Sequence, residues 1–444
     1  MNMNNIHVAV IGGGCAGLSA ATSLVERGIQ VTVFESSSQL GGRARTVVVE
    51  NNDQMHLLDN GQHILLGAYK ETLRLLKKVG VEEKKVLKRI PLQMHLLNKQ
   101  ASTVFSLNSA HYLPAPFNTL IALLTCKGLS FSERLSAIKF MYQLKSSVFQ
   151  LNKDIPLWQF LTSQHQTERA IEMLWEPLCL AALNTPLEIA STRVFLNVLK
   201  DSFTGNKRSS DFLLPKLDLS QVLSQPLAQY IQAKGGIIRL NKRVRGLKTS
   251  DNGFYVETRD GQHYFSHVVV ALSPARVDHL LEDIPKLQHA MTQVQAYSYQ
   301  PIYTIYLQYP RTIKMPKIMI GLSGTIAQWV FDKGQLTGEK GLLAVIISAS
   351  GKHQRMNQDE LALLVAQELY HAFPQLTKPL WYKVIAEKRA TFTCTPSQTR
   401  PTNKTAQPGL YLAGDYTYAD YPATIEGAVR SGLNCANLIV NHVT

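Results

Sequence analysis

The sequence has few cysteines and no long apolar run. Only five of its 444 residues are cysteines, and no two form a CxxC pair or lie at metal-ligand spacing from a histidine, which argues against a disulfide framework or a zinc site. No segment approaches the ~18 to 20 uninterrupted apolar residues that a membrane-spanning helix needs. The apolar run that starts at Val8 meets glycines at once, so it does not form a signal peptide. We therefore expect a cytoplasmic protein whose membrane contact is at most peripheral.

Charged residues are also scarce, and those of negative sign most of all. They make up 18% of the chain, against 45% hydrophobic residues, which is the balance of a folded globular protein and excludes a disordered one. Lysine and arginine outnumber aspartate and glutamate by 46 to 32, a net charge of +14. This excess suits an anionic surface. Nucleic acid is the poorer candidate, because no recognisable nucleic-acid module contains the basic residues.

The first 35 residues predict a strand, a turn, a helix and a second strand. Residues 7–11 are a short apolar run typical of a buried strand, and residues 30–35 form another. Between them, the glycine-rich GGGCAG at 12–17 is followed by a helical pattern that ends at Gly28. This order indicates a βαβ unit that opens a parallel sheet.

The turn of this unit has the GxGxxG spacing of a dinucleotide-binding site. Gly12 would allow the tight turn, Gly14 would let a pyrophosphate approach the backbone, and Gly17 would permit close helix packing. The helix N-terminus, which includes Ala16, supplies partial positive charge for phosphates. Glu35 ends the second strand, where a carboxylate binds ribose hydroxyls. The alternative, a plain glycine turn, does not account for the flanking elements or for Glu35.

Changes of pattern along the chain indicate two interleaved domains. Residues 91–224 have the pattern of amphipathic helices broken by loops, whereas nucleotide-domain character returns at 225–285 and 385–444. We therefore predict an α/β fold with a discontinuous nucleotide-binding domain (1–90, 225–285 and 385–444). Into it is inserted an α+β substrate-binding domain that faces the membrane (91–224 and 286–384).

Two further segments resemble FAD enzymes of the amine oxidase and phytoene desaturase superfamily. LGGRART contains Gly42 and Arg43, where the superfamily brings a backbone turn and an arginine to the pyrophosphate and isoalloxazine. LAGD ends in Gly414 and Asp415, which match a strand end that places a carboxylate near the ribityl chain. The resemblance implies that the nucleotide-binding domain is a Rossmann-type, glutathione-reductase-like FAD domain.

The same resemblance points to three other cofactor contacts. In PATIEGA, the N–H groups of Thr424 and Ile425 can face the flavin O2/N1 edge, where negative charge develops on reduction. Val244 in NKRVRGL matches a position that lends a backbone contact to the adenine, and an ordinary buried strand valine is the alternative. Because no cysteine lies between Gly414 and Gly427, we expect FAD to be held noncovalently.

A narrower resemblance covers nearly the whole chain. It is to the hydroxysqualene dehydroxylases, squalene-associated FAD-dependent enzymes of bacterial hopanoid pathways, and the segments that carry it are LLDNGQHILLGAY (57–69), WEPLCLAALNTP (175–186), SSDFLLPKLDLS (209–220), EKRATF (387–392) and PATIEGAVRSG (422–432). The resemblance implies reduction of hydroxysqualene to squalene by reduced FAD, and it admits contact with squalene-synthase-like enzymes. The alternatives are a carotenoid or phytoene-type desaturase, a flavin amine oxidase, and a noncatalytic flavin-bound isoprenoid carrier.

Such a reaction needs a proton donor beside the departing hydroxyl. His63 in the DNGQH turn is the candidate, since in related flavoenzymes this turn, which includes Gly61, lies near the flavin ring. A histidine that merely bonds backbone is the alternative. For Asp59, we expect capping of the turn rather than proton transfer.

Two segments could face a membrane. Residues 70–89 carry eight lysines and arginines against three glutamates, which indicates either a solvated helix face or a patch that meets an anionic leaflet at the inner face of the cell membrane. LPAPFNTLIALLTC, from Leu113 to Cys126, is a candidate for shallow insertion, with a core helix as the alternative.

Overall fold

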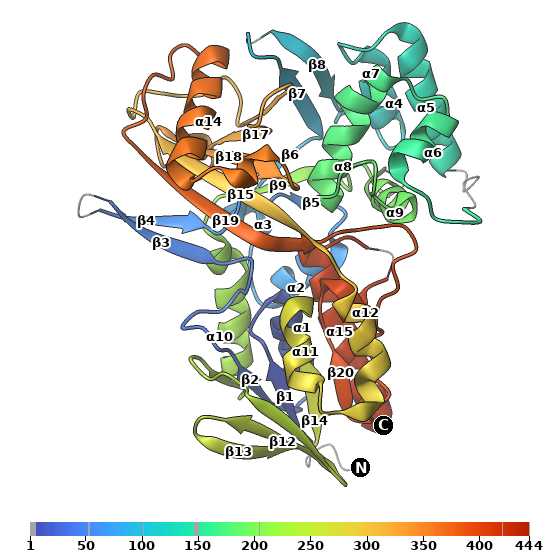
Figure 1. Cartoon of the computed structure of the whole chain (residues 1–444), viewed down its shortest axis with the longest axis vertical. Coiled ribbons are helices and arrows are strands. Elements are labelled where there is room, and N and C mark those ends of the chain that lie inside the picture. Colours follow the sequence, from blue (N-terminus) through green and yellow to red (C-terminus); the bar gives the residue numbers. More distant parts are fainter. Residues whose placement is uncertain are drawn as a thin grey trace.

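The fold combines a parallel sheet at one end of the molecule with a large mixed sheet and a group of helices at the other (Figure 1). The computed structural model describes residues 6–51, 54–100, 102–145, 151–203, 205–419 and 421–443. The outer ends of the predicted nucleotide-binding domain, residues 1–5 and 444, lie outside the described residues.

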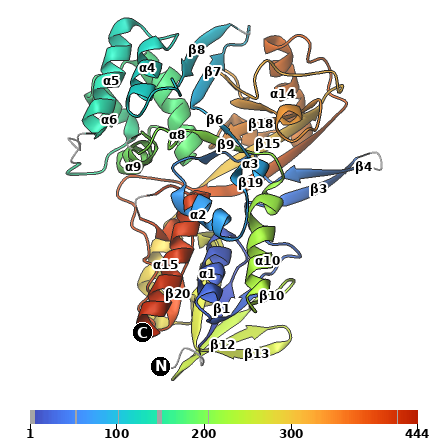
Figure 2. The same ribbon diagram turned by 180° about the vertical axis from the view of Figure 1, so that it is seen from behind.

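The parallel sheet confirms the predicted Rossmann-type fold. Its strands lie in the order β10 (Ile237–Arg239), β2 (Gln30–Phe34), β1 (His7–Ile11), β14 (His267–Val270) and β20 (Leu410–Leu412). One face is covered by α1 (Cys15–Glu26), α10 (Gln225–Ala233) and α15 (Ile425–Val443) (Figure 2). The other packs on a three-stranded antiparallel sheet of β11 (Gly246–Ser250), β12 (Gly253–Thr258) and β13 (Gly261–Phe265). Burial from both sides explains why the central strands are mostly apolar.

A seven-stranded sheet forms the centre of the other half. Its order is β19 (Trp381–Phe392), β15 (Tyr299–Gln308), β18 (Leu342–Ser348), β17 (Trp329–Asp332), β16 (Met319–Leu322), β7 (Gln93–Leu97) and β8 (Thr103–Asn108). The helix α14 (Gln358–Ala372) covers one face. The long strand β19 crosses residue 385, where the sequence indicated a domain boundary, so this strand runs from one half of the molecule towards the other (Figure 1).

The mostly helical pattern predicted after residue 91 is wrong for 93–108. These residues form the antiparallel hairpin β7–β8, and β7 pairs in parallel with β16, where Gly321 faces Leu96. In β8, Phe105 and Leu107 are buried while their neighbours are not, which is the two-residue period of a strand. Short apolar runs of this kind are ambiguous until the partner strand is known.

Helices do dominate the rest of this region. They are α4 (Phe117–Thr125), α5 (Phe131–Lys145), α6 (Leu157–Ser163), α7 (Glu168–Ala170), α8 (Glu176–Leu183) and α9 (Thr192–Phe203). Their common core contains Phe140, Trp175 and Phe195, and the buried Trp175 ring donates its Nε1–H to Gln166 Oε1 at 2.9 Å.

Smaller elements join the two halves. They are the hairpin β3 (Thr46–Asn51) and β4 (Gln54–Asp59), the strands β5 (Leu65–Leu66), β6 (Leu87–Ile90) and β9 (Phe212–Pro215), and the helices α2 (Lys70–Lys78), α3 (Glu83–Val86), α11 (Pro274–Leu281), α12 (Gln288–Gln295) and α13 (Lys333–Leu336). Over the part of the chain that the structure describes, every helix is too short or too polar to cross a membrane.

Candidate active site

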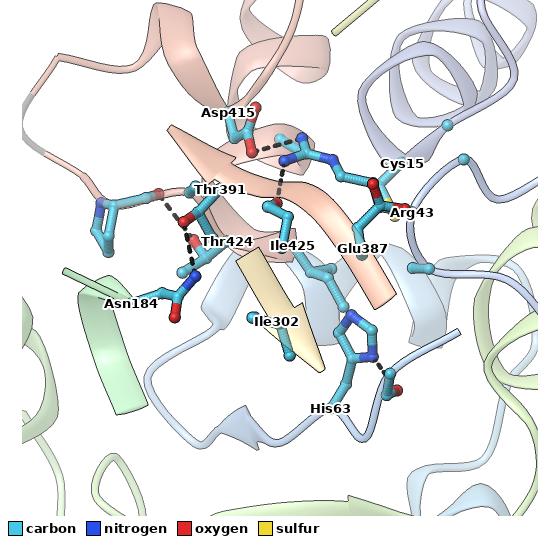
Figure 3. Close-up of a pocket in the computed structure, with 18 of the residues that line it drawn as sticks. Cys15, Arg43, His63, Asn184, Ile302, Glu387, Thr391, Asp415, Thr424 and Ile425 are labelled. Carbon is cyan, nitrogen blue, oxygen red and sulfur yellow. Dashed lines mark hydrogen bonds and ion pairs between the residues drawn. The ribbon is translucent and has the colours of Figure 1, made fainter. Parts of the chain in front are cut away.

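One cavity of about 1620 Å³ lies where the carboxyl ends of the parallel strands meet the seven-stranded sheet. Ligands of open α/β sheets bind at this edge. Every predicted site residue except Gly17 lines the cavity. The residues drawn in Figure 3 come from segments far apart in the chain, among them Cys15, Asn184 and Asp415.

The first glycine turn has the tight geometry that its sequence predicts. Gly12 has φ +113°, and a Cβ there would lie 2.5 Å from the carbonyl oxygen of Ala271. A Cβ on Gly17 would lie 2.0 Å from the Gly12 oxygen, so this glycine acts behind the turn, in the packing of α1. Gly14 is different, because a Cβ there would meet only the Gly42 Cα, at an ordinary contact distance of 4.0 Å. It caps α1 without a side chain and leaves the N–H groups around Ala16 facing the cavity.

Glu35 lies just beyond β2 and is fixed by backbone. Its carboxylate accepts N–H groups from Gly13 and from Ser37, each at 2.8 Å. These bonds hold the side chain at the cavity wall beside the glycine turn. A carboxylate oriented in this way keeps lone pairs for the hydroxyls of a sugar.

The second glycine pair lies directly against the first turn. The Gly41 N–H donates to the Gly13 oxygen at 2.8 Å, and Gly42 has φ +61° with its Cα close to that of Gly14. Arg43 then reaches across the cavity wall, donating to Asp415 at 2.6 Å and to the Ala390 carbonyl at 2.7 Å. Burial alone would lower the pKa of Arg43, but the adjacent carboxylate of Asp415 outweighs it and raises the pKa. Arg43 is therefore a fixed cation in the cavity rather than a mobile surface group.

The C-terminal motif closes the same end of the cavity. Gly414 follows β20, and a Cβ there would lie 2.3 Å from the Tyr416 ring. Thr424 precedes α15, where its hydroxyl accepts the Gly427 N–H at 3.1 Å, and Ile425 begins the helix. Both line the cavity, so the positive end of the α15 dipole faces it together with that of α1.

Val244 lines the cavity from the loop between β10 and β11. The alternative for Val244, an ordinary buried strand valine, is therefore wrong. The chain leaves the parallel sheet after Arg239 and turns through Asn241, which has φ +55°, before β11 begins at Gly246. A loop position leaves the backbone of Val244 free of ladder hydrogen bonds.

His63 lies in the cavity wall with a defined tautomer. Its Nδ1 is 2.7 Å from the Gly61 carbonyl, which can only accept, so Nδ1 carries the hydrogen and Nε2 is an acceptor in the neutral ring. Burial lowers the pKa of His63, and the positive charge of Arg43 lowers it further, against the opposing effect of the Gly61 bond. At neutral pH the imidazole is therefore uncharged. Its role as proton donor remains a prediction, and it requires that Nε2 first gain a proton.

Asp59 lies behind the wall and not in it. Its Oδ1 accepts the Leu219 N–H at 2.8 Å, and Oδ2 lies 4.0 Å from Lys333 Nζ. Burial raises the pKa of Asp59 to about 6. The carboxylate joins β4 to the segment before α10, so the predicted capping of its own turn is wrong.

Sequence reasoning missed Asn184, which connects three parts of the cavity. It ends α8 with φ +47°, and its side-chain amide donates to the Pro301 carbonyl at 3.2 Å and to the Thr391 hydroxyl at 3.0 Å. Its Oδ1 accepts the Ala349 N–H at 2.7 Å. In the sequence, the LNTP segment stands out only through its family likeness. An asparagine that ends an apolar helix is the local signal that could have identified Asn184.

Two polar side chains near Arg43 also went unpredicted. Asn60 donates to Glu387 at 3.2 Å, and both line the cavity. Gln62 lines it as well, and its buried Oε1 has no hydrogen-bond partner among the described residues. An unpaired acceptor in a wall is suited to a ligand that carries a donor.

One arm of the cavity is mainly apolar. Side chains from α8, α9, β9 and the seven-stranded sheet form this arm, and they include Met94, Leu178, Phe195, Leu199, Phe212 and Trp329. The cavity therefore joins a polar end with two glycine turns to an apolar end of the kind that takes a hydrocarbon chain.

Comparison with known proteins agrees with this geometry. Residues 15–440 match the family described as flavin containing amine oxidoreductase. The chain is 26% identical to a hydroxysqualene dehydroxylase of Zymomonas mobilis, covering 98% of this chain and 99% of the relative. It is 23% identical to a zeta-carotene desaturase of Solanum lycopersicum, covering 98% and 81%. The solved cyclohexylamine oxidase of Brevibacterium oxydans has the same fold, with a TM-score of 0.71, 18% identity and 99% coverage of both chains.

The fold and the cavity, with these matches, define a flavin-dependent oxidoreductase. More narrowly, the chain belongs to the flavin-containing amine oxidoreductase family.

Proposed function

We propose that the protein binds FAD noncovalently and reduces hydroxysqualene to squalene. Both the sequence resemblance and the match to the hydroxysqualene dehydroxylase of Zymomonas mobilis support this reaction. The proposed substrate is a water-insoluble isoprenoid. We therefore also propose that the protein is cytoplasmic, lies at the inner face of the cell membrane and contacts squalene-synthase-like enzymes.

The residues of the polar end fit FAD. Gly14 and Gly42 leave backbone open to a pyrophosphate, and Glu35 presents a carboxylate for the ribose. Asp415 holds Arg43 in the cavity wall by accepting a hydrogen bond from its guanidinium group. The N-terminus of α15 would stabilise negative charge on the flavin ring. When reduced and bound, the flavin supplies a hydride.

The observation that carries the choice of substrate is the unpaired Oε1 of Gln62 in the wall of a cavity that has a long apolar arm. A buried acceptor without a donor costs about 1–3 kcal/mol. A long isoprenoid with one hydroxyl satisfies both the apolar arm and this acceptor, because its O–H donates to Gln62 while its oxygen remains free to accept a proton from His63 Nε2. A desaturase substrate that is purely hydrocarbon leaves the Gln62 acceptor unpaired.

The reaction balances with one proton and one hydride. The allylic C–O bond breaks as the hydroxyl takes a proton and leaves as water, and a C–H bond forms at the allylic cation. His63, once protonated at Nε2, donates that proton to the hydroxyl oxygen. Asn184 keeps its part of the cavity wall rigid through its bonds to Pro301 and Thr391.

The alternatives differ in how well they match the cavity. A flavin amine oxidase acts on amines, whereas the side chains that α8 and α9 contribute to the cavity include no carboxylate that could pair with an ammonium group. A noncatalytic flavin-bound carrier would share the polar end and the apolar arm, so turnover is what separates it from the enzyme.

Product analysis tests the proposal. The protein is reconstituted with FAD, reduced without oxygen and mixed with hydroxysqualene, and the extracted lipid is separated by chromatography. We expect squalene in an amount equal to the reduced flavin. A carrier returns hydroxysqualene unchanged, which would contradict the proposal. The variant Gln62→Leu should keep its flavin content but bind hydroxysqualene about 10-fold more weakly.

A further inference from the structure

Two helices on the surface of the molecule carry apolar residues on their outer faces. In α4, Phe117, Ile121 and Leu124 follow a spacing of four and three residues, and their exposed fractions are 56%, 37% and 41%. In α5, Phe131 and Leu135 are 64% and 46% exposed and lie on one face. The spacing places each set along a single outer stripe.

The same two helices also have apolar inner faces. Ala122 and Leu123 of α4 are buried, as are Ala137 and Phe140 of α5. An ordinary surface helix buries one apolar face and presents polar groups to water. When the outer face of a surface helix is apolar as well, that face is typical of a site that contacts a second apolar environment outside the protein.

The two stripes belong to one surface. The helices α4 and α5 pack on each other, and Arg134 of α5 donates to the Leu124 carbonyl at the end of α4 at 3.1 Å. Figures 1 and 2 both show these helices at the outer edge of the molecule, away from the parallel sheet. We call this the α4–α5 surface, and its outer residues are Tyr112, Phe117, Ile121, Leu124, Phe131, Leu135 and Tyr142.

The charges around this surface are mainly positive. Residues 111–142 contain Lys127, Arg134 and Lys139 but a single carboxylate, Glu133. That carboxylate is already bonded, accepting the Ser130 N–H and the Thr167 hydroxyl, both at 2.7 Å. Cations at the border of an apolar face match the headgroups of an anionic leaflet. In a pair of copies joined through this surface, Lys127 and Lys139 would meet like charges.

The basic run at 70–89 is a weaker candidate. Lys78 pairs with Glu26 at 2.6 Å and Lys85 with Glu82 at 2.7 Å, while Arg89 bonds Glu83 and Asp211. These cations are largely neutralised by nearby carboxylates, as expected of a solvated face.

The α4–α5 surface also lies one helix away from the cavity. The inner face of α5 packs on α9, and Phe195 and Leu199 of α9 line the apolar arm. From these observations we infer that the α4–α5 surface docks on a bilayer containing anionic phospholipid, so that an isoprenoid passes from the acyl region into the apolar arm. The inference rests on the proposed function for the identity of that isoprenoid.

Sedimentation with vesicles tests this docking. The flavin-loaded protein is mixed with vesicles of phosphatidylcholine and phosphatidylglycerol, and the bound fraction is measured for the parent and for Phe117→Glu/Phe131→Glu. Both positions are exposed, so the variant should fold and keep its flavin. We expect binding to fall at least 10-fold, since two apolar side chains lose their burial in the leaflet.

A matched control introduces the same charges on an unrelated face. Leu363 and Leu380 are 51% and 69% exposed, the first on α14 and the second just before β19, and Leu363→Glu/Leu380→Glu should bind vesicles like the parent. Equal loss in both variants, or none in either, would overturn the inference. A parent that is dimeric without lipid and made monomeric by Phe117→Glu/Phe131→Glu would assign the surface to a second copy instead. Conversion of hydroxysqualene in detergent is measured separately, so the proposed reaction can hold even if vesicle binding does not.

Discussion

Arg43 and Asp415 are 372 residues apart in the chain and lie 2.6 Å apart in the cavity wall. The pair joins the second glycine turn to the end of β20, so the N-terminal and C-terminal motifs form one continuous site. Asp415 is 3% exposed, and its Arg43 partner is the nearest compensation for that buried charge.

Breaking this pair should weaken cofactor binding. In Asp415→Asn and in Arg43→Ala, one charge of the pair is left uncompensated and the two motifs lose their connection. We expect the affinity for FAD to fall about 10-fold or more, as measured by fluorescence quenching when FAD is added to the apoprotein. The control is Arg311→Ala, a change at an exposed arginine in the segment between β15 and β16. An unchanged affinity in both site variants would show that the pair does not serve the cofactor.

Two glycines of the first turn should respond differently to substitution. In Gly14→Val the added side chain points into open space where a pyrophosphate would lie, so we expect a folded protein that has lost flavin. In Gly17→Val the side chain would collide with the Gly12 backbone, so we expect loss of folding itself. Circular dichroism and flavin absorbance separate the two outcomes. Flavin retained by a folded Gly14→Val variant would contradict the assigned phosphate site.

Much of the nucleotide-binding fold follows from local sequence. The strand at 7–11, the glycine turn and the helix after it each have a signal within a few residues, and the structure confirms them. The hairpin at 93–108 has no such signal, because its strands are short and one of them pairs with β16, far away in the sequence. The alternative of a buried strand valine at Val244 was wrong for a related reason, since a single apolar residue between charged ones does not distinguish a strand from a loop.

The amide of Asn184 should contribute to stability. Asn184→Ala removes its bonds to Pro301, Thr391 and Ala349 and leaves their buried groups unpaired. We expect unfolding to require about 2–4 kcal/mol less free energy, as measured by denaturant titration. Asn184→Gly is the matched comparison, because glycine accepts the positive φ without restoring the bonds. A stability close to that of the parent in the glycine variant would show that backbone strain, and not hydrogen bonding, determines this position.

His63 should produce a characteristic pH dependence. Its pKa lies below the ordinary value of about 6.5 because of burial and Arg43, so the protonated form needed for acid catalysis grows as the pH falls. We therefore expect the oxidation of the reduced protein by hydroxysqualene to accelerate from pH 7.5 to pH 5.5, as followed by stopped-flow absorbance.

A substituted protein checks this assignment. In His63→Gln the rate should fall about 10²-fold and lose its pH dependence, with flavin content unchanged. His279→Gln, at another histidine of the cavity wall, should behave like the parent. A parent rate that is flat, or that rises with pH, would remove His63 from the role of proton donor.

The site itself was only partly predictable. Glycine motifs define a cofactor site because each glycine has a local geometric cause, as at Gly12 with its positive φ. The roles of Asn184 and Gln62 depend on neighbours from several segments, and the electrostatic setting of His63 depends on Arg43, which the sequence does not place beside it. Such relationships exist only once the chain has folded.

The direction of electron flow tests the central claim most directly. A dehydroxylase delivers hydride to its substrate, whereas a desaturase takes hydride from it, so the two change the flavin absorbance in opposite directions. We predict that protein reduced without oxygen regains its oxidised flavin absorbance when hydroxysqualene is added, and that oxidised protein keeps its absorbance with squalene or phytoene. Bleaching of the oxidised protein by phytoene, with no response of the reduced protein to hydroxysqualene, would contradict the account.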